Sequence, residues 1–228
     1  MKKFNIAIDG PAGAGKSTIA RLVAERLGFI YVDTGAMYRA VTWKILRTDT
    51  SLEQDDQMIR LVQHTDIQLL PGEKGQLVYV DGDDVTLNIR YPEVTSNVSR
   101  VASVAEIRKI LVAKQKEMAA SKGVVMDGRD IGSTVLPDAE VKVFLTASVR
   151  VRADRRFKEL QAAGQADGIT LERLEADIAA RDKMDQERET SPLVRAEGAV
   201  LLDTTEMSIP EVVESILSLC REHAVGGK

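Results

Sequence analysis

The sequence predicts an α/β fold in which helices cover a parallel β-sheet. Short apolar runs of strand length alternate along the chain with longer segments of helical period, a pattern typical of repeated βα units. The 228 residues are 44% hydrophobic and 29% charged, as in an ordinary globular protein with a sizeable core. The length allows one large domain or two small ones, and we interpret the chain as a single domain, 1–228.

Five apolar runs are the expected strands, because each is short and closely bounded by Asp, Gly, Thr or Pro. They are residues 4–8, 29–32, 124–126, 141–145 and 199–202. Segments of helical period lie between and after them, at residues 17–27, 36–46, 107–120, 149–163, 171–189 and 209–221. Ser208 and Glu211 form a capping-box pattern with Pro210 in the first turn, which predicts where the last helix begins.

One region, 66–84, interrupts the alternation. Two stretches with strand pattern, 67–70 and 77–80, are accompanied by Gly-containing turns at 71–75 and 81–82. They predict a small antiparallel insert. Because the region lies in the middle of the βα pattern, we interpret it as a subdomain and not as an independent domain.

The overall charge gives no support for a polyanionic partner. The chain has 31 Lys and Arg against 35 Asp and Glu, a formal net charge of −4 at pH 7. Proteins held mainly by phosphate attraction to nucleic acid or to an anionic membrane usually carry a basic excess. We therefore expect neither nucleic acid nor membrane as a partner.

Cysteine and histidine counts exclude two further kinds of site. A single Cys allows no disulfide within the chain, and two His with one Cys cannot build a Cys/His zinc cluster. Cys220 lies in the apolar stretch 216–220 and is expected to be a packed thiol. No run of 18 apolar residues and no secretory signal pattern is present, which favours a reduced, cytoplasmic location.

The first predicted strand leads directly into a loop that matches G-x-x-x-x-G-K-[ST] and opens a helix. The glycines allow the backbone to wrap closely around a phosphate chain at the positive end of the helix. Lys16 would neutralise the β and γ oxygens, the Ser17 hydroxyl would bind Mg²⁺, and Thr18 would pack against or cap the first turn. The predicted triphosphate-binding residues are Gly10, Pro11, Ala12, Gly13, Ala14, Gly15, Lys16, Ser17 and Thr18.

Motors, switches and kinases share this loop, so the residues after the third predicted strand decide among them. The chain lacks the Asn-Lys-x-Asp string of switch GTPases. A motor ATPase usually closes this strand with an acidic pair whose Glu activates water, whereas here Asp127 is followed by Arg129. Asp127 would orient the water shell of the metal. The pattern favours handling of a second phosphate over hydrolysis.

Thr34 and Arg39 follow the second predicted strand, at the edge of the sheet where ligands of open α/β folds collect. The loop at 10–18 and the turn 127–130 are expected at the same edge. Thr34 at a helix start and Arg39 on that helix would approach an anion. Taken alone, the two residues are equally consistent with an ordinary helix cap and a solvated arginine.

Two further clusters carry charge. Arg181, Asp185 and Arg188 are spaced i, i+4, i+7 and would form one stripe on a helix, which by itself is more often a salt-bridged surface. After the fourth strand, a second cluster would close as a lid over the triphosphate or form a solvated helix face. Its members are Arg150, Arg152, Arg155 and Arg156, with Arg155 as the candidate triphosphate contact.

Four segments in this order resemble bacterial cytidylate kinases, over essentially the whole chain. They are the loop at 10–18, DTGAMYR at 33–39, DGRDIG at 127–132 and RDKMDQER at 181–188. The resemblance implies the P-loop nucleoside monophosphate kinase fold, with five parallel strands in the order 2-3-1-4-5. It also implies a monophosphate-binding insert at about 62–100 and an Arg-rich lid at about 150–170.

The same resemblance implies transfer of the γ-phosphoryl group of ATP to CMP or dCMP in the presence of Mg²⁺, and it assigns roles to residues. The catalytic residues would be Lys16, Asp127, Arg129 and Arg188. The monophosphate would be bound by Thr34, Arg39, Arg129 and Arg188, the sugar by Arg181 and Asp185, and the base by Ser99, Arg108 and Asp130.

The chemistry of cytosine suits the base-binding set. Its exocyclic amine donates a hydrogen bond and its N3 and O2 accept, so Asp130 would accept from the amine while Arg108 and Ser99 donate. Uracil would place a carbonyl against Asp130, a mismatch that discriminates strongly. Two alternatives stay open from the sequence, a kinase for another acceptor (UMP or a non-nucleotide) and a non-catalytic nucleotide-gated binding protein. We expect a monomer.

Overall fold

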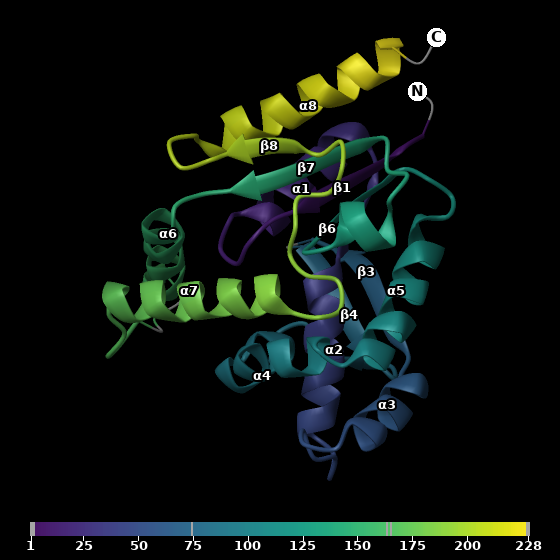
Figure 1. Ribbon diagram of the computed structural model, residues 1–228, viewed down its shortest axis with the longest axis vertical. Coiled ribbons are helices and arrows are strands. Elements are labelled where there is room, and N and C mark those ends of the chain that lie inside the picture. Colours follow the sequence, from purple (N-terminus) through teal and green to yellow (C-terminus); the bar gives the residue numbers. More distant parts are fainter. Residues whose placement is uncertain (1–2, 74, 163, 165, 227–228) are drawn as a thin grey trace.

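A five-stranded parallel sheet forms the centre of the computed structural model, which describes residues 3–73, 75–162, 164 and 166–226 (Figure 1). The spatial order is β2-β6-β1-β7-β8, and every neighbouring pair is parallel. The strands are β1 (Asn5–Asp9), β2 (Ile30–Asp33), β6 (Val124–Gly128), β7 (Val141–Thr146) and β8 (Val200–Asp203). The predicted fold class and strand order, 2-3-1-4-5, are confirmed.

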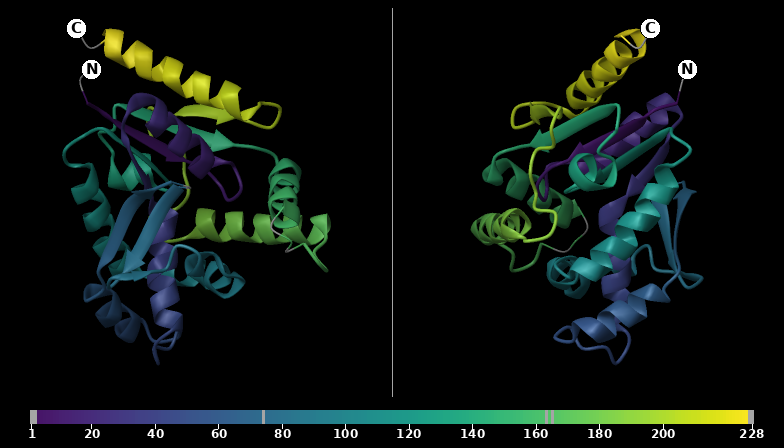
Figure 2. Two further views of the ribbon diagram at one scale, coloured as in Figure 1. Left: turned by 180° about the vertical axis from the view of Figure 1, so that it is seen from behind. Right: turned by 45° about the vertical axis from the view of Figure 1, so that its right-hand side comes forward.

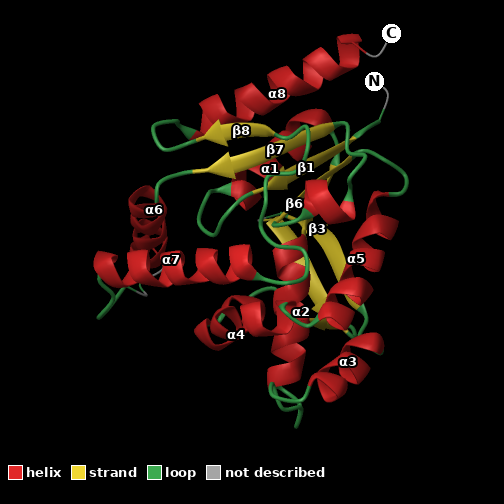
Figure 3. Cartoon of the chain, viewed as in Figure 1, coloured by secondary structure: helices red, strands yellow, loops and turns green. Residues whose placement is uncertain are grey.

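Both faces of this sheet are buried, which explains why its strands read as continuous apolar runs. Ile6 and Ile8 of β1 pack on one face with α1 (Lys16–Leu27) and α8 (Ile209–Gly226). Ala7, between them, packs on the opposite face, in the cluster that includes Ala119 at the end of α5 (Ala105–Ala119). Figure 3 shows the strands enclosed by helices on both sides.

A second apolar cluster lies outside the sheet, around α2 (Thr34–Leu46). It joins α2 to α3 (Asp55–Gln63), α4 (Pro92–Ala102) and the insert. Helices α3 and α4 were not predicted from the sequence. The signal for α4 is present, because Val94, Val98 and Val101 recur at i, i+4, i+7 and are buried. For α3 it is weaker, since only Met58 and Val62 are buried in nine residues.

The predicted antiparallel insert is confirmed. It consists of β3 (Ile67–Gly72), β4 (Gly75–Val80) and the two-residue β5 (Asp83–Asp84), which the sequence did not predict, followed by the 3₁₀ turn η1 (Asn88–Arg90). Figure 2 shows this small sheet alongside α2. The Gln76 side chain connects it to the central sheet, donating to the Tyr31 carbonyl at 2.6 Å and accepting from the Asp33 amide at 3.0 Å.

Helices α6 (Val149–Ala162) and α7 (Leu171–Glu187) project beyond the carboxyl end of β7 (Figure 1). The predicted helix at 149–163 includes residue 163, which lies outside the described residues. Helix α7 ends at Glu187, two residues earlier than predicted, so Arg188 is not part of the helical stripe. The insert at 62–100 and the lid at 150–170, whose residues 74, 163 and 165 are not described, stay predictions as functional units.

The C-terminal helix confirms two local predictions. Glu211 accepts hydrogen bonds from the Ser208 amide at 2.8 Å and the Ser208 hydroxyl at 2.6 Å, so the capping pattern operates at the start of α8. Cys220 is a free, buried thiol in the α1–α8 cluster, and burial raises its pKa to about 11. Among the helices of the described ranges, none is long and apolar enough to cross a membrane.

Candidate functional site

The phosphate loop joins β1 to α1 in a conformation that requires glycine. Gly10 has φ +148°, and a β-carbon there would lie 2.0 Å from the Leu145 carbonyl oxygen of β7. Gly15 has φ +83° and immediately precedes α1, so the chain turns at this glycine and then enters the helix. The loop is therefore shaped by its own backbone against the sheet.

Lys16 is buried within this loop, and its Nζ donates to the Pro11 carbonyl at 2.8 Å. Burial, followed by the nearby Arg129, lowers the pKa of Lys16. The lysine thus folds back across the loop that it follows. An anion placed in the loop would compensate the buried ammonium.

Asp127, at the end of β6, faces the first turn of α1. Its Oδ2 accepts from the Ser17 hydroxyl at 3.0 Å, and its Oδ1 accepts from the Tyr31 hydroxyl at 2.9 Å. The carboxylate is 3% exposed, and burial together with the neighbouring Asp33 raises its pKa. A cation at this position would lower the cost of keeping Asp127 ionised.

A divalent cation fits the chemistry of this pair of side chains. Among the described residues, no group of three His, Cys, Asp or Glu side chains converges to hold a metal. Mg²⁺ typically keeps several waters and takes only one or two protein ligands together with phosphate oxygens. The Ser17 hydroxyl, with Asp127 beside it, meets that requirement next to the phosphate loop.

Asp33 is the N-cap of α2, and Thr34 is the first residue of the helix. The alternative interpretation of Thr34 as an ordinary helix cap is therefore wrong. The Asp33 carboxylate accepts from the Ala36 amide at 2.8 Å and from Arg39 at 3.0 Å. The Thr34 hydroxyl donates to the Asp127 carbonyl at 2.7 Å and is buried. A β-carbon on Gly128 would lie 2.6 Å from this hydroxyl, so glycine is required for the close approach.

Arg108 and Asp130 form a buried ion pair on the other side of the cleft. Their side chains are 3% and 6% exposed. The Arg108 guanidinium also lies 5.3 Å from the centre of the Tyr38 ring, within range of a cation–π interaction. Arg108 is therefore a buried residue of the cleft and is not exposed on the surface of α5.

Helix α7 brings a second set of charges to the cleft. Asp185 is buried and pairs with Arg129 at 2.8 Å, so the predicted stripe faces the cleft at this point. Although burial opposes it, Arg129 lowers the pKa of Asp185. Burial, followed by Arg129, lowers the pKa of Arg181 to about 10. Arg188 lies just past the helix and donates to the carbonyls of Thr190 and Ser191.

Asp9 lies beneath the cleft, at the end of β1. Its two carboxylate oxygens accept from the Ile131 and Gly132 amides, each at 2.8 Å. These amides belong to the π-helical turn η2 (Ile131–Val135), which directly follows Asp130. Burial raises the pKa of Asp9 to about 6. Asp9 therefore connects the start of the phosphate loop to the turn that directly follows Arg129 and Asp130.

The structure brings most of the predicted site residues into one cleft. Those that line it are Ala12, Gly13, Lys16, Ser17, Thr34, Arg39, Ser99, Arg108, Asp127, Arg129, Asp130, Arg181, Asp185 and Arg188. Predicted residues outside the lining are Gly10, Pro11, Ala14, Gly15, Thr18 and Arg155. Lining residues that sequence reasoning missed are Asp33, Gly35, Tyr38, Val98, Ala102 and Gly128. An Asp placed three residues before Ala36 at a helix start was an available signal for Asp33.

The four arginines of the predicted lid cluster behave differently from one another. Only Arg152 reaches the phosphate loop, donating to the Ala12 carbonyl at 2.8 Å and pairing with Asp182 of α7. Arg155 donates to the Thr204 hydroxyl and carbonyl, away from the cleft lining. Arg150 pairs with Glu175 and Arg156 with Glu159 on the exposed surface, as the solvated-face alternative expects.

Several polar atoms of the cleft have no partner within the described part of the protein. They are the Tyr38 hydroxyl and the Nε atoms of Arg39, Arg108 and Arg181. Buried donors normally find a hydrogen-bond partner, so a cluster of open ones in a cleft points to a polar ligand. Five lining arginines with a lysine further indicate that this ligand is anionic.

Comparison with known proteins agrees with this geometry. The sequence profile of the family described as cytidylate kinase matches residues 6–222. The cytidylate kinase of Desulforamulus reducens is 56% identical over 213 residues, covering 93% of this chain and 95% of that protein. That of Lysinibacillus sphaericus is 52% identical over 221 residues, covering 97% and 98%. A solved structure of an uncharacterized protein from Eubacterium ventriosum has a TM-score of 0.51 at 13% identity, covering 95% of this chain and 97% of that one, a likeness of fold alone.

Proposed function

The chain belongs to the cytidylate kinase family, and we propose that it transfers the γ-phosphoryl group of ATP to CMP or dCMP, giving CDP or dCDP. One observation carries the proposal beyond family membership. A phosphate loop with Lys16 and the buried Arg108–Asp130 pair line the same cleft. The first set of groups suits a triphosphate, and the second suits the edge of cytosine.

At the donor end, the loop at 10–18 would hold the phosphates of ATP with its backbone amides. Lys16 would exchange its bond to the Pro11 carbonyl for the β and γ oxygens. Ser17 would bind Mg²⁺, with Asp127 accepting from the Ser17 hydroxyl or from metal-bound water. The metal would neutralise charge on the phosphates.

At the acceptor end, Thr34, Arg39, Arg129 and Arg188 would bind the monophosphate of CMP. Arg39 and Arg129 are paired with Asp33 and with Asp185, respectively. A phosphate can replace such a carboxylate because both accept bidentate hydrogen bonds from a guanidinium. Asp185 and Arg181 would then be free to bind the hydroxyls of the sugar.

The base would be recognised by Ser99, Arg108 and Asp130. Asp130 would accept from the cytosine amine, and Arg108 and Ser99 would donate to N3 and O2. The Arg108–Asp130 pair holds both groups in place and compensates their charges in the buried site. Uracil would leave Asp130 facing a carbonyl oxygen, which we expect to be strongly disfavoured.

The chain supplies position and charge rather than covalent chemistry. The acceptor phosphate is already an anion, so no side-chain general base is required. Lys16, Arg129 and Arg188 would stabilise charge on the phosphoryl group as it moves between the two phosphates. Closure of α6 and α7 over the cleft would exclude water and limit hydrolysis of ATP.

Arg152 supports a role for α6 and α7 as a lid, because it joins both helices to the phosphate loop. Contact between Arg155 and ATP stays a prediction, since it would require this side chain to leave Thr204. A cytoplasmic location and a monomeric state also stay predictions.

An acceptor panel tests the function directly. The purified chain with ATP and Mg²⁺ should phosphorylate CMP and dCMP. The value of kcat/KM for UMP should be lower than that for CMP by a factor of roughly 100 or more. ADP release is followed in a coupled assay, and CDP is identified by chromatography. Without an acceptor, ADP release should stay close to background.

Other results would replace the proposal with a definite alternative. Equal turnover of UMP and CMP would contradict base recognition by Asp130. Turnover with a non-nucleotide acceptor alone would indicate another small-molecule kinase. ATP binding without turnover of any acceptor would indicate a nucleotide-gated binding protein.

A further inference from the structure

Tyr31 is a partly buried residue whose hydroxyl contacts the site although Tyr31 does not line the cleft. It lies on β2, two residues before Asp33, so the two side chains emerge on the same face of the sheet. In the parallel register Tyr31 is opposite Val125 and Asp33 is opposite Asp127. Asp127 is thus a diagonal neighbour of Tyr31 on one face, a separation that an aromatic side chain can span.

The Tyr31 hydroxyl spans this separation. It donates to Asp127 Oδ1 at 2.9 Å, while the Ser17 hydroxyl donates to Oδ2 at 3.0 Å. The two carboxylate oxygens thus have different donors, one from the sheet and one from the phosphate loop. With its ring packed against the α1–α8 cluster, Tyr31 has little freedom to turn away.

The backbone of Tyr31 is held as firmly as its side chain. Its carbonyl accepts from the Gln76 side chain at 2.6 Å, and Gln76 also bonds to the Asp33 amide. The insert therefore fixes the free edge of β2 at the residue that reaches Asp127. This support is independent of the phosphate loop.

We propose that Tyr31 is a positioning residue, whose hydroxyl fixes Asp127 so that Asp127 in turn aims the Ser17 hydroxyl at the metal–triphosphate. A hydroxyl has one proton and two lone pairs. When the Ser17 hydroxyl donates its hydrogen bond to Asp127, the lone pairs of its oxygen face away from Asp127 and are available to a cation. Tyr31 would contact neither phosphate nor metal, but its hydroxyl holds the Asp127 carboxylate in one orientation. The inference rests on the kinase function proposed above.

Tyr31→Phe tests the inference, because it removes one oxygen and retains the ring that packs in the core. Tyr79→Phe is the matched control, a half-buried tyrosine on β4 that lies outside the cleft lining. Asp127→Asn supplies the reference pattern for disturbance of the carboxylate itself. Wild-type enzyme is assayed first with CMP, so that failure of the function and failure of the Tyr31 role are separate results.

We expect Tyr31→Phe to lower kcat about 5- to 20-fold and to raise the Mg²⁺ concentration for half-maximal rate several-fold. KM for CMP should stay within about twofold of wild type, since Tyr31 does not line the cleft. Calorimetry with ADP gives a readout other than activity. The affinity gained on adding Mg²⁺ should fall several-fold, whereas the affinity for ADP alone should not change.

The possible outcomes distinguish a positioning role of Tyr31 from a purely structural role. A shift in Mg²⁺ dependence that resembles that of Asp127→Asn at smaller amplitude, with Tyr79→Phe like wild type, supports the inference. A lower melting temperature with unchanged kcat and Mg²⁺ dependence would show that the hydroxyl only satisfies a buried carboxylate. An equal loss of affinity for CMP, ADP and Mg²⁺–ADP would show general distortion and would also overturn it.

Discussion

The two ends of the cleft are built in different ways. The donor end is one continuous segment, the loop at 10–18, shaped by backbone conformation and by contact with β7. The acceptor end is assembled from side chains of α2, α4, α5, α7 and the turn after β6. Its arginines are mostly paired with carboxylates of the protein itself, at Asp33, Asp130 and Asp185.

This difference determines when each end is ready for its ligand. Backbone amides and Lys16 at the donor end need only a small change to bind phosphate. At the acceptor end, Arg39 and Arg129 are paired with carboxylates until a phosphate takes the place of a carboxylate, so binding requires an exchange of partners. We therefore expect variants at the donor end to change kcat, and variants at the acceptor end to change affinity and selectivity.

Lys16→Ala should have the largest effect. Removing the buried ammonium takes away the charge opposite the moving phosphoryl group, and we expect kcat to fall by about 10³-fold or more, or about 4 kcal/mol. KM for CMP should change little because Lys16 belongs to the donor end. The measurement is steady-state kinetics, with circular dichroism to confirm the fold.

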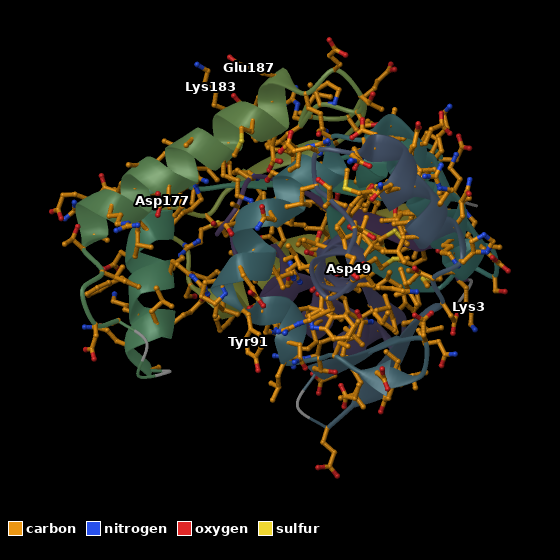
Figure 4. All side chains as sticks on the ribbon, turned by 90° about the horizontal axis from the view of Figure 1, so that it is seen from below. Lys3, Asp49, Tyr91, Asp177, Lys183 and Glu187 are labelled. Atoms are coloured by element: carbon orange, nitrogen blue, oxygen red, sulfur yellow. The ribbon has the colours of Figure 1, made fainter. Side chains whose placement is uncertain are left out.

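Lys183→Ala is the control for this variant. Lys183 is exposed on α7, where Figure 4 shows it near Glu187 on the outer side of the helix, and its contact with Glu187 spans 4.0 Å. It should keep wild-type kinetics. Retained turnover in Lys16→Ala would mean that the phosphate loop is assigned to the wrong role.

Asp9 connects the two ends, and its titration should be visible in the stability of the fold. Its pKa is raised from 3.8 to about 6. Between these values the folded state binds more protons than the unfolded state, so the stability contribution of Asp9 is complete below pH 3.8 and is lost as the pH rises through 6. The difference amounts to on the order of 3 kcal/mol.

The Asp9→Asn variant should lack this decline. We expect the free energy of unfolding of wild type, relative to the variant, to decrease between pH 4 and pH 6.5, as measured by urea denaturation at several pH values. Asp138→Asn, at an exposed position, should keep the wild-type slope. Parallel curves for wild type and Asp9→Asn would mean that Asp9 titrates normally in the folded protein.

Asp130→Asn tests selectivity at the acceptor end. The amide nitrogen would offer a donor to the O4 of uracil, and the cytosine amine would exchange a charged carboxylate acceptor for a neutral amide oxygen. We expect the CMP/UMP ratio of kcat/KM to fall by roughly 30- to 100-fold, with part of the change a gain for UMP. An unchanged ratio, with Asp138→Asn as the reference, would remove Asp130 from base recognition.

The contrast between a local donor end and an acceptor end assembled from distant elements also explains which features could be predicted from the sequence. Each strand of the sheet and the donor end are local patterns, because the G-x-x-x-x-G-K-[ST] spacing fixes its own conformation. Arg108 and Asp185 look like surface residues in isolation, and only packing of α5 and α7 against the cleft buries them. Residue-by-residue resemblance identified both. Tyr38 and Tyr31 were missed because their contacts with Arg108 and Asp127 join residues distant in sequence. Asp33 was missed although its partners, Ala36 and Arg39, are close in sequence.

The smallest expected effect concerns the link between insert and sheet. Gln76→Ala removes two hydrogen bonds to the edge of β2, at Tyr31 and Asp33, and should lower the free energy of unfolding by about 1–2 kcal/mol. The melting temperature should fall by roughly 2–6 °C. Because Asp33 caps α2 and pairs with Arg39, KM for CMP should rise a few-fold, while KM for ATP stays within about twofold.

Gln68→Ala is the matched control, since Gln68 lies exposed on β3 and its side chain donates to the nearby Asp66 at 2.7 Å. It should leave both KM values and the melting temperature close to wild type. A lower melting temperature in Gln76→Ala without a change in KM for CMP would show that the insert stabilises the fold but does not adjust the acceptor end. A matching rise in both KM values would show that the two ends are not independent, because β2 supports Asp127 through Tyr31 as well as Arg39 through Asp33.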